Sequence, residues 1–215
     1  MGHVAIDGPG GSGKSTVAAA LAKRLGWERL DTGAMYRAVA LLALRHHVAV
    51  ADAPALAELA RAMELEVGEQ VVLDGEDVTT QIRSEAVDAV VSPISAHPAV
   101  RSELVARQRT WAAAHDTGVV EGRDIGSVVL PDALLKVYLD AHPDVRAARR
   151  AGQRAAAPDA ALRAALAQRD AADSTRAHAP LLIAPGALVI DSSELGVDEV
   201  VERLLAALEE RGVRP

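Results

Sequence analysis

Short apolar runs alternate with amphipathic stretches along the chain, and this alternation predicts strands and helices in turn. Apolar runs bounded by polar turns, which are typical of parallel strands buried on both faces, lie at 3–7, 118–120, 135–139 and 187–190, with a further strand candidate at 29–31. The spacing of apolar residues predicts helices over 15–25, 34–45, 53–63, 84–91, 99–114, 143–150, 158–171 and 197–211. Alternation of this kind favours an α/β fold with a doubly wound parallel sheet of about five strands.

The stretch from about 32 to 115 is too long for a single crossover between neighbouring strands. It contains two short alternating runs, 64–67 and 70–73, on either side of Gly68-Glu69, a pattern that predicts a hairpin. We therefore expect one domain over 1–215 with a substrate subdomain inserted within 32–115. The segment 151–160 is rich in alanine and contains Pro158, and we expect it to be mobile.

The composition of the chain excludes several classes of function. The chain has 215 residues, no cysteine, no phenylalanine and a net charge of −7. Without cysteine it forms no disulfide and no thiolate metal site, and its acidity argues against a broad nucleic-acid surface. Apolar runs do not reach the roughly 18 residues of a membrane span, and the N-terminus lacks the pattern of an export signal. We expect a cytoplasmic protein that binds neither nucleic acid nor membrane.

A glycine-rich motif, G-x-x-x-x-G-K-[ST], lies between the first predicted strand and the first predicted helix, as in phosphate-binding loops. Its glycines let backbone N–H groups turn toward phosphate oxygens, and the following helix N-terminus adds partial positive charge. Lys14 is expected to reach the β- and γ-phosphates, and the Ser15 hydroxyl to bind Mg²⁺. The expected ATP contacts are Gly8, Pro9, Gly10, Gly11, Ser12, Gly13, Lys14, Ser15 and Thr16.

The sequence around this motif argues against a GTPase and a motor ATPase. A GTPase would carry a guanine-reading N-K-x-D, which the chain lacks, and a motor ATPase would carry an acidic pair after an apolar strand such as Val119-Val120. The residues that follow that strand are Glu121-Gly122-Arg123-Asp124, so an arginine enters the expected site. This favours a small kinase, in which several arginines meet two phosphorylated substrates.

Several segments resemble bacterial cytidylate kinases, in the same order along the chain. They are V-A-I-D-G-P at 4–9, D-T-G-A-M-Y-R at 31–37, G-E-D-V at 75–78 with I-R at 82–83, E-G-R-D-I-G at 121–126, R-D at 169–170, D-S-T-R at 173–176 and A-P-L at 179–181. The resemblance runs from about 3 to 208. It implies a P-loop kinase with an NMP-binding insert within 32–115 and a small lid over 146–180. The implied reaction is Mg²⁺-dependent phosphoryl transfer from ATP to CMP or dCMP, giving ADP and CDP or dCDP. We expect the protein to be a monomer.

The resemblance also implies roles for individual side chains. Lys14, Arg37, Arg123 and Arg176 would be catalytic, with the acceptor phosphate on Arg37 and Arg123. The guanidinium fork suits this task because it matches a phosphate bidentately. The implied CMP contacts are Thr32, Arg37, Ser92, Arg101, Arg123, Asp124, Arg169 and Asp173, of which Ser92, Arg101 and Asp124 read the base and Asp173 and Arg169 hold the ribose.

Other assignments stay open at this point. Tyr36 is more often a packing residue than a contact. Asp31 caps a turn or lies near Mg²⁺, and the arginines at 146, 149 and 150 are either a solvated face or a lid stem near ATP. The stretch 191–193 lies where ligands bind in open α/β sheets and is expected to border adenine. Two other functions remain as alternatives: a kinase for another acceptor, such as UMP or a non-nucleotide metabolite, and an ATP-binding regulatory module without turnover.

Overall fold

The computed structural model describes residues 2–153, 160–176 and 179–213, and the chain divides into two compact units. The sheet unit comprises Met1–Arg29 and His115–Pro215, and the insert unit comprises Leu30–Ala114. Strand β2 (Glu28–Asp31) carries the chain from one unit into the other. That the insert unit binds the acceptor nucleotide stays a prediction.

A five-stranded sheet is the main element of the sheet unit. Its strand order is β2-β6-β1-β7-β8, with β6 at Thr117–Gly122, β1 at Gly2–Asp7, β7 at Leu135–Asp140 and β8 at Leu188–Asp191. The pairings of β1 with β6, of β1 with β7 and of β7 with β8 are parallel. The expected α/β fold with a parallel sheet of about five strands is confirmed.

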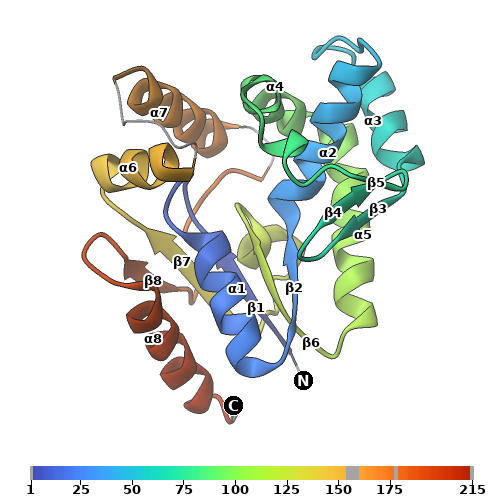
Figure 1. Ribbon diagram of the computed structural model, residues 1–215. Helices are drawn as coiled ribbons and strands as arrows, with labels where there is room; N and C mark the ends of the chain where they lie inside the picture. The colour runs from blue at the N-terminus through green and yellow to red at the C-terminus, as the bar shows by residue number, and fades with distance from the viewer. Residues whose placement is uncertain (1, 154–159, 177–178, 214–215) are drawn as a thin grey trace. The chain divides into compact units, whose positions relative to one another are not determined.

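Two helices cover one face of this sheet. Helix α1 (Lys14–Leu25) and helix α8 (Val197–Glu209) contact each other and contribute to one apolar core with the sheet strands. Leu21 of α1 and Leu204 of α8 are fully buried in that core. Burial of each such leucine stabilises the fold by roughly 1.5–3 kcal/mol. Because β1 connects directly to α1 through the glycine-rich loop, this core fixes both ends of the loop (Figure 1).

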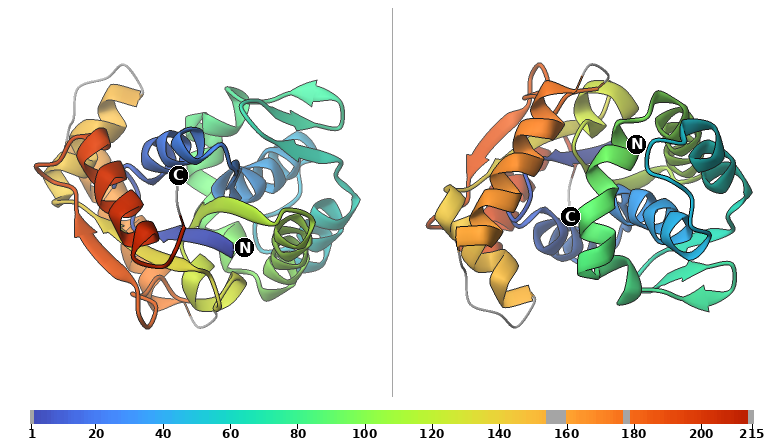
Figure 2. Two further views of the ribbon diagram at one scale, coloured as in Figure 1. Left: turned by 90° about the horizontal axis from the view of Figure 1, so that it is seen from below. Right: turned by 90° about the horizontal axis from the view of Figure 1, so that it is seen from above.

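The segment after β7 forms two helices that lie side by side, α6 (Pro143–Gln153) and α7 (Ala160–Thr175) (Figures 1 and 2). An ion pair of 3.1 Å between Arg163 Nε and an Asp144 carboxylate oxygen joins them. Of the alanine-rich stretch at 151–160, residues 154–159 lie outside the described residues. Helix α7 continues past the predicted end at 171, so that Asp173 is helical.

The insert unit combines helices with a small antiparallel sheet. Its helices are α2 (Thr32–Arg45), α3 (Ala53–Ala62), η1 (Gln81–Arg83), α4 (Glu85–Ala96) and α5 (Pro98–Ala114). Strand β3 (Leu65–Val67) pairs with β4 (Val71–Leu73), which confirms the predicted hairpin, and β5 (Glu76–Asp77) adds a third strand (Figure 2, teal). The Asp31 side chain caps α2 by accepting a hydrogen bond of 3.1 Å from the Ala34 N–H, as expected for a turn cap.

The end of α4 was predicted wrongly. The helix was expected to stop at residue 91, before Pro93, but it continues to Ala96 with Pro93 inside it. A proline removes one backbone hydrogen bond from a helix, and here the buried side chains of Val87, Val91 and Ile94 on both sides of it hold the helix together. Among the helices of the described residues, none combines the length and apolar character needed to cross a membrane.

Gly8 lies so close to β7 that a larger residue at this position should destabilise the fold. An added Cβ at Gly8, whose φ is +151°, would lie 2.1 Å from the Leu139 carbonyl oxygen. We expect Gly8→Ala to lower the free energy of unfolding by at least about 2 kcal/mol, measured by urea denaturation. Gly152→Ala in α6 is the control, because nothing lies within 4 Å of the added Cβ, and its effect should stay within roughly 1 kcal/mol. Equal stability of the two variants would contradict the role assigned to Gly8.

Candidate active site

The glycine-rich loop lies between the carboxyl end of β1 and the N-terminus of α1, which begins at Lys14. The N–H groups of the first helical turn have no intrahelical partner, and the helix dipole favours an anion at this end. A side chain at Gly11 would collide with α6, since an added Cβ would lie 2.7 Å from the Arg146 carbonyl oxygen. The loop is therefore a backbone cradle suited to phosphate, as the motif predicts.

The Lys14 side chain is buried inside this loop. Its Nζ donates to the Pro9 carbonyl at 2.7 Å and lies 3.5 Å from the Ser12 hydroxyl. Burial, and to a smaller degree repulsion by the Arg123 guanidinium, lowers the pKa of the Lys14 amine to about 7, although the charges of Glu121 and Asp7 oppose the shift. Negative charge brought to Lys14 would raise this pKa again.

The Ser15 hydroxyl lies against a carboxylate that the sequence analysis did not select. Ser15 Oγ donates to Glu121 Oε2 at 2.7 Å, and Arg29 Nη1 donates to Glu121 Oε1 at 3.0 Å. A hydroxyl and a carboxylate are hard oxygen donors of the kind that Mg²⁺ takes together with water and phosphate oxygens, so the residues fit this ion. The described residues contain no group of three or more carboxylates or imidazoles that would hold a metal alone. The signal for Glu121 in the sequence was its position at the end of a buried apolar strand.

Predicted acceptor-side residues of the sheet unit gather beside the loop. Arg123 donates from Nη1 to the Gly8 carbonyl at 3.0 Å and from Nε to Asp173 at 2.9 Å. Arg176 Nη2 lies 3.6 Å from an Asp124 oxygen. Burial alone would raise the pKa of the Asp173 carboxyl, but the nearby Arg123 and Arg169 guanidinium groups outweigh it and lower that pKa. The fold thus places several arginines next to the phosphate loop.

Two arginines of α6 contact the phosphate loop, whereas the sequence left their role open. Arg146 donates from Nη1 to the Gly10 carbonyl at 3.2 Å and forms an ion pair with Asp170, whose other oxygen accepts from the Gly10 N–H at 3.2 Å. Arg149 donates to the Ser12 carbonyl at 3.1 Å. Helix α6 is therefore tied to the loop by side chain to backbone hydrogen bonds.

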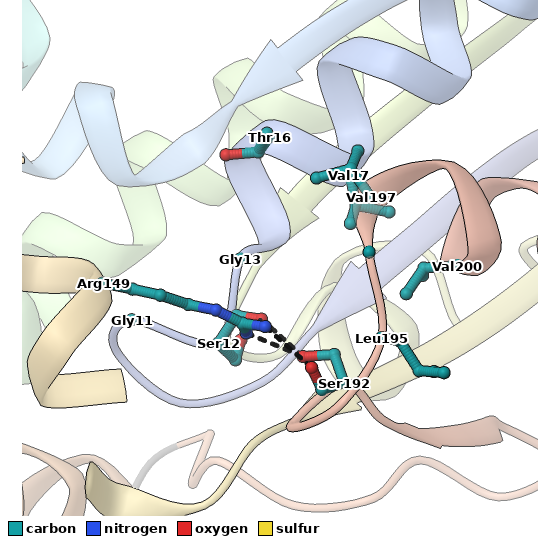
Figure 3. Close-up of a pocket in the computed structure, with 11 residues that line it drawn as sticks. Gly11, Ser12, Gly13, Thr16, Val17, Arg149, Ser192, Leu195, Val197 and Val200 are labelled. Atoms are coloured by element: carbon teal, nitrogen blue, oxygen red, sulfur yellow. Dashed lines mark hydrogen bonds between the residues drawn. The ribbon is translucent and has the colours of Figure 1, made fainter. Parts of the chain in front are cut away.

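A cavity of about 280 Å³ opens beside the loop (Figure 3). Its lining comes from the loop, from α1 and α6, and from the segment around the start of α8: Gly11, Ser12, Gly13, Thr16, Val17, Arg149, Ser192, Leu195, Gly196, Val197 and Val200. Arg149 reaches across it to the Ser192 hydroxyl at 2.9 Å and to the Ser192 carbonyl at 2.7 Å (Figure 3). Ser192 also donates to the Ser12 carbonyl at 3.1 Å. The lining combines apolar side chains with polar groups, which suits a heterocycle.

Four of the predicted contacts lie in the insert unit. Arg37 donates from Nη1 to the Ile82 carbonyl at 2.9 Å and from Nη2 to Asp88 at 2.6 Å, a partner that the sequence did not indicate. Arg101 is buried, lies 5.8 Å from the centre of the Tyr36 ring and donates to the Tyr36 hydroxyl at 3.2 Å. Thr32, also buried, opens α2, and Ser92 is half-buried within α4.

A parallel sheet with a phosphate loop between β1 and α1, flanked by arginines, defines a P-loop kinase. A gluconokinase from Sinorhizobium meliloti has a similar fold, with a TM-score of 0.52 and 15% sequence identity over 97% of this chain and 92% of that one. The family described as cytidylate kinase matches residues 4–210. The cytidylate kinase of Rhodococcus opacus is 50% identical over 97% of this chain and 95% of its own length, and that of Symbiobacterium thermophilum is 50% identical over 94% and 93%. The chain belongs to the cytidylate kinase family.

The buried amine of Lys14 generates a prediction about stability and pH. Its pKa is lower in the folded chain, about 7, than the ordinary 10.5, so the unfolded state binds more protons between these values. The free energy of unfolding should therefore increase as the pH is raised from about 7 to about 10.5. Lys14→Met should remove this pH dependence. Near pH 7 its free energy of unfolding should exceed that of the wild type by on the order of a few kcal/mol.

Urea denaturation at several pH values between 6 and 10 measures this difference. Lys23→Met is the matched control, because Lys23 lies exposed on the same helix. It should follow the wild-type curve throughout. A Lys14→Met curve parallel to that of the wild type would show that Lys14 is not a buried cation with a lowered pKa.

Proposed function

We propose that the chain transfers the terminal phosphoryl group of ATP to CMP and dCMP, with Mg²⁺, giving ADP and CDP or dCDP. The observation that carries the proposal is a phosphate loop with a buried Lys14, and Ser15 bonded to Glu121, in a chain half identical to cytidylate kinases over nearly its whole length. We further propose a monomer of the cytoplasm that binds neither nucleic acid nor membrane, which the net charge of −7 supports.

The donor would bind at the loop through backbone N–H groups of Gly8–Thr16 and through Lys14. Mg²⁺, when bound, would neutralise charge on the phosphates, with Ser15 as a ligand and Glu121 beside it. Glu121 orients the Ser15 hydroxyl through a hydrogen bond of 2.7 Å, and Arg29 holds Glu121 in place. The cavity bounded by Arg149 and Ser192 would take the adenine ring, in keeping with the expectation for 191–193.

The acceptor would present a phosphate oxygen that is already ionised at neutral pH, so the reaction needs no general base. What remains is to hold two polyanions in line and to offset charge on the transferred group. Arg37, Arg123 and Arg176 would do this together with Lys14. The Asp88 and Asp173 carboxylates support this assignment, because each holds one of these guanidinium groups in a defined orientation.

Recognition of cytosine requires an acceptor for its N4 amino group and donors for N3 and O2. Asp124, Ser92 and Arg101 supply these types of group, and the contact of Arg101 with Tyr36 supports a fixed direction for its donors. Thr32 would add a further contact to CMP. The ribose hydroxyls would bind Asp173 and Arg169. We propose that the insert within 32–115 and the lid over 146–180 close over both nucleotides and keep water from the transferred group.

A panel of acceptors assayed by ADP release tests the proposed reaction. We expect CMP and dCMP to be the fastest acceptors, ahead of UMP and of non-nucleotide alcohols. Lys14→Met should reduce the rate by about 10²–10³ or more while the protein still folds, because it removes a cation from the transferred group.

The two alternatives give different results in the same assay. A faster rate with UMP or another small acceptor would assign the chain to a kinase of different specificity. A wild-type protein that binds ATP and is inert with every acceptor would indicate a regulatory module.

Asp124 provides a separate test of base recognition. We expect Asp124→Ala to raise the KM for CMP by about 10- to 100-fold, because the acceptor for N4 is lost, and to change the KM for ATP little. Asp132→Ala, at an exposed turn, is the control and should leave both constants unchanged. Equal increases for CMP and ATP would argue against a base-reading role for Asp124.

A further inference from the structure

Asp7 is a buried carboxylate that the proposed chemistry does not use. It is the last residue of β1, directly before the phosphate loop, and only 3% of its surface is exposed. Its Oδ1 accepts a hydrogen bond of 2.8 Å from the Ile125 N–H, and its Oδ2 accepts one of 2.8 Å from the Gly126 N–H. Both donors open the short helix η2 (Ile125–Val129), which follows Arg123 and Asp124 directly.

The burial of this carboxylate is unfavourable in itself. Removal from water raises its pKa to about 6; the two N–H donors and, more weakly, the Lys14 charge limit the rise, whereas the nearby Asp124 charge adds to it. A buried ionisable group is weak evidence for stability, and in some proteins such a group defines one arrangement of the chain. The arrangement that Asp7 defines is the start of η2, whose first N–H groups have no helical partner.

The backbone on either side of Arg123 and Asp124 is held by β1. The parallel ladder pairs Asp7 with Gly122, and this is the last pair of β6 with β1. After Gly122 the chain leaves the sheet, and the Asp7 side chain binds it again at Ile125 and Gly126. Asp7 thus holds the chain at two places, through strand pairing at Gly122 and through its side chain at Ile125 and Gly126. Arg123 and Asp124 are the two residues between these places. The Arg123 side chain then reaches the carbonyl of Gly8, the residue after Asp7.

We propose that Asp7 is a positioning residue for the acceptor: its carboxylate clamps the backbone of Ile125 and Gly126 and so holds Arg123 and Asp124 in place beside the phosphate loop. This inference rests on the proposed function, in which Arg123 binds the acceptor phosphate and Asp124 the base. It predicts that loss of the clamp affects the acceptor more than the donor, because the phosphate loop is also held by the ladders of β1 and by α1.

Asp7→Asn tests the clamp with little change in shape. Its side-chain amide keeps one acceptor and turns a donor toward a backbone N–H, so one hydrogen bond is replaced by a repulsive contact. Substitution of a neutral group for a buried carboxylate does not by itself oppose folding. We expect the KM for CMP to rise about tenfold or more and kcat to fall, while the KM for ATP changes by no more than about twofold.

Val4→Ala is the structural control, because Val4 is a fully buried residue of the same strand. It should lower stability and leave both KM values unchanged. If Asp7→Asn behaves in the same way, with unaltered KM for CMP, Asp7 has a structural role alone and the inference is overturned.

Amide hydrogen exchange measured by NMR tests the clamp without reference to activity. In the wild type, the Ile125 and Gly126 amides should exchange at least about 100-fold more slowly than freely exposed amides, and Asp7→Asn should accelerate them selectively. Rapid exchange of both amides in the wild type would overturn the inference, even if the variant failed to fold. A wild type that shows the protection but is inactive with CMP would instead refute the proposed function.

Discussion

Lys14 carries an ammonium group that the fold removes from water, with hydrogen bonds to the Pro9 carbonyl and to the Ser12 hydroxyl. A buried cation is stabilised by any negative charge that comes close to it. The lowered pKa of Lys14 shows that the charged amine is destabilised by burial when no such anion is bound. The phosphate loop, the N-terminus of α1 and the neighbouring arginines all add positive potential at the same place. An anion bound there gains from every one of them, since the surroundings screen charge less than water does.

Crowded positive charge also has to be held in a defined geometry. In the sheet unit, Arg123 is paired with Asp173 and Arg176 with Asp124. A guanidinium group that is already oriented loses less side-chain entropy when it meets a phosphate. For a reaction that consists mainly of alignment and charge compensation, such orientation is a large part of what the protein contributes. In the proposed reaction, these carboxylates therefore contribute as much as the arginines that they orient.

Several features of this site were readable from the sequence, and others were not. The phosphate loop is contiguous, so the residue types at Gly8–Ser15 were enough to predict both its position and its chemistry. Glu121 and Asp88 were missed because a carboxylate becomes significant only when its partner is known, and the partners are Ser15 and Arg37, far away in the chain. Pro93 indicated that α4 would end before it. The helix continues to Ala96 because side chains on both sides of Pro93 are buried.

The sequence by itself determined the strand and helix alternation, the phosphate loop and the kinase family, because each depends on local pattern or on residue identity. Only the tertiary structure decided that β6 and β7 flank β1, that α6 reaches the loop through Arg146 and Arg149, and that Asp7 clamps the start of η2. These contacts join residues more than a hundred positions apart. Their free energy depends on distance and burial, which neither composition nor periodicity contains.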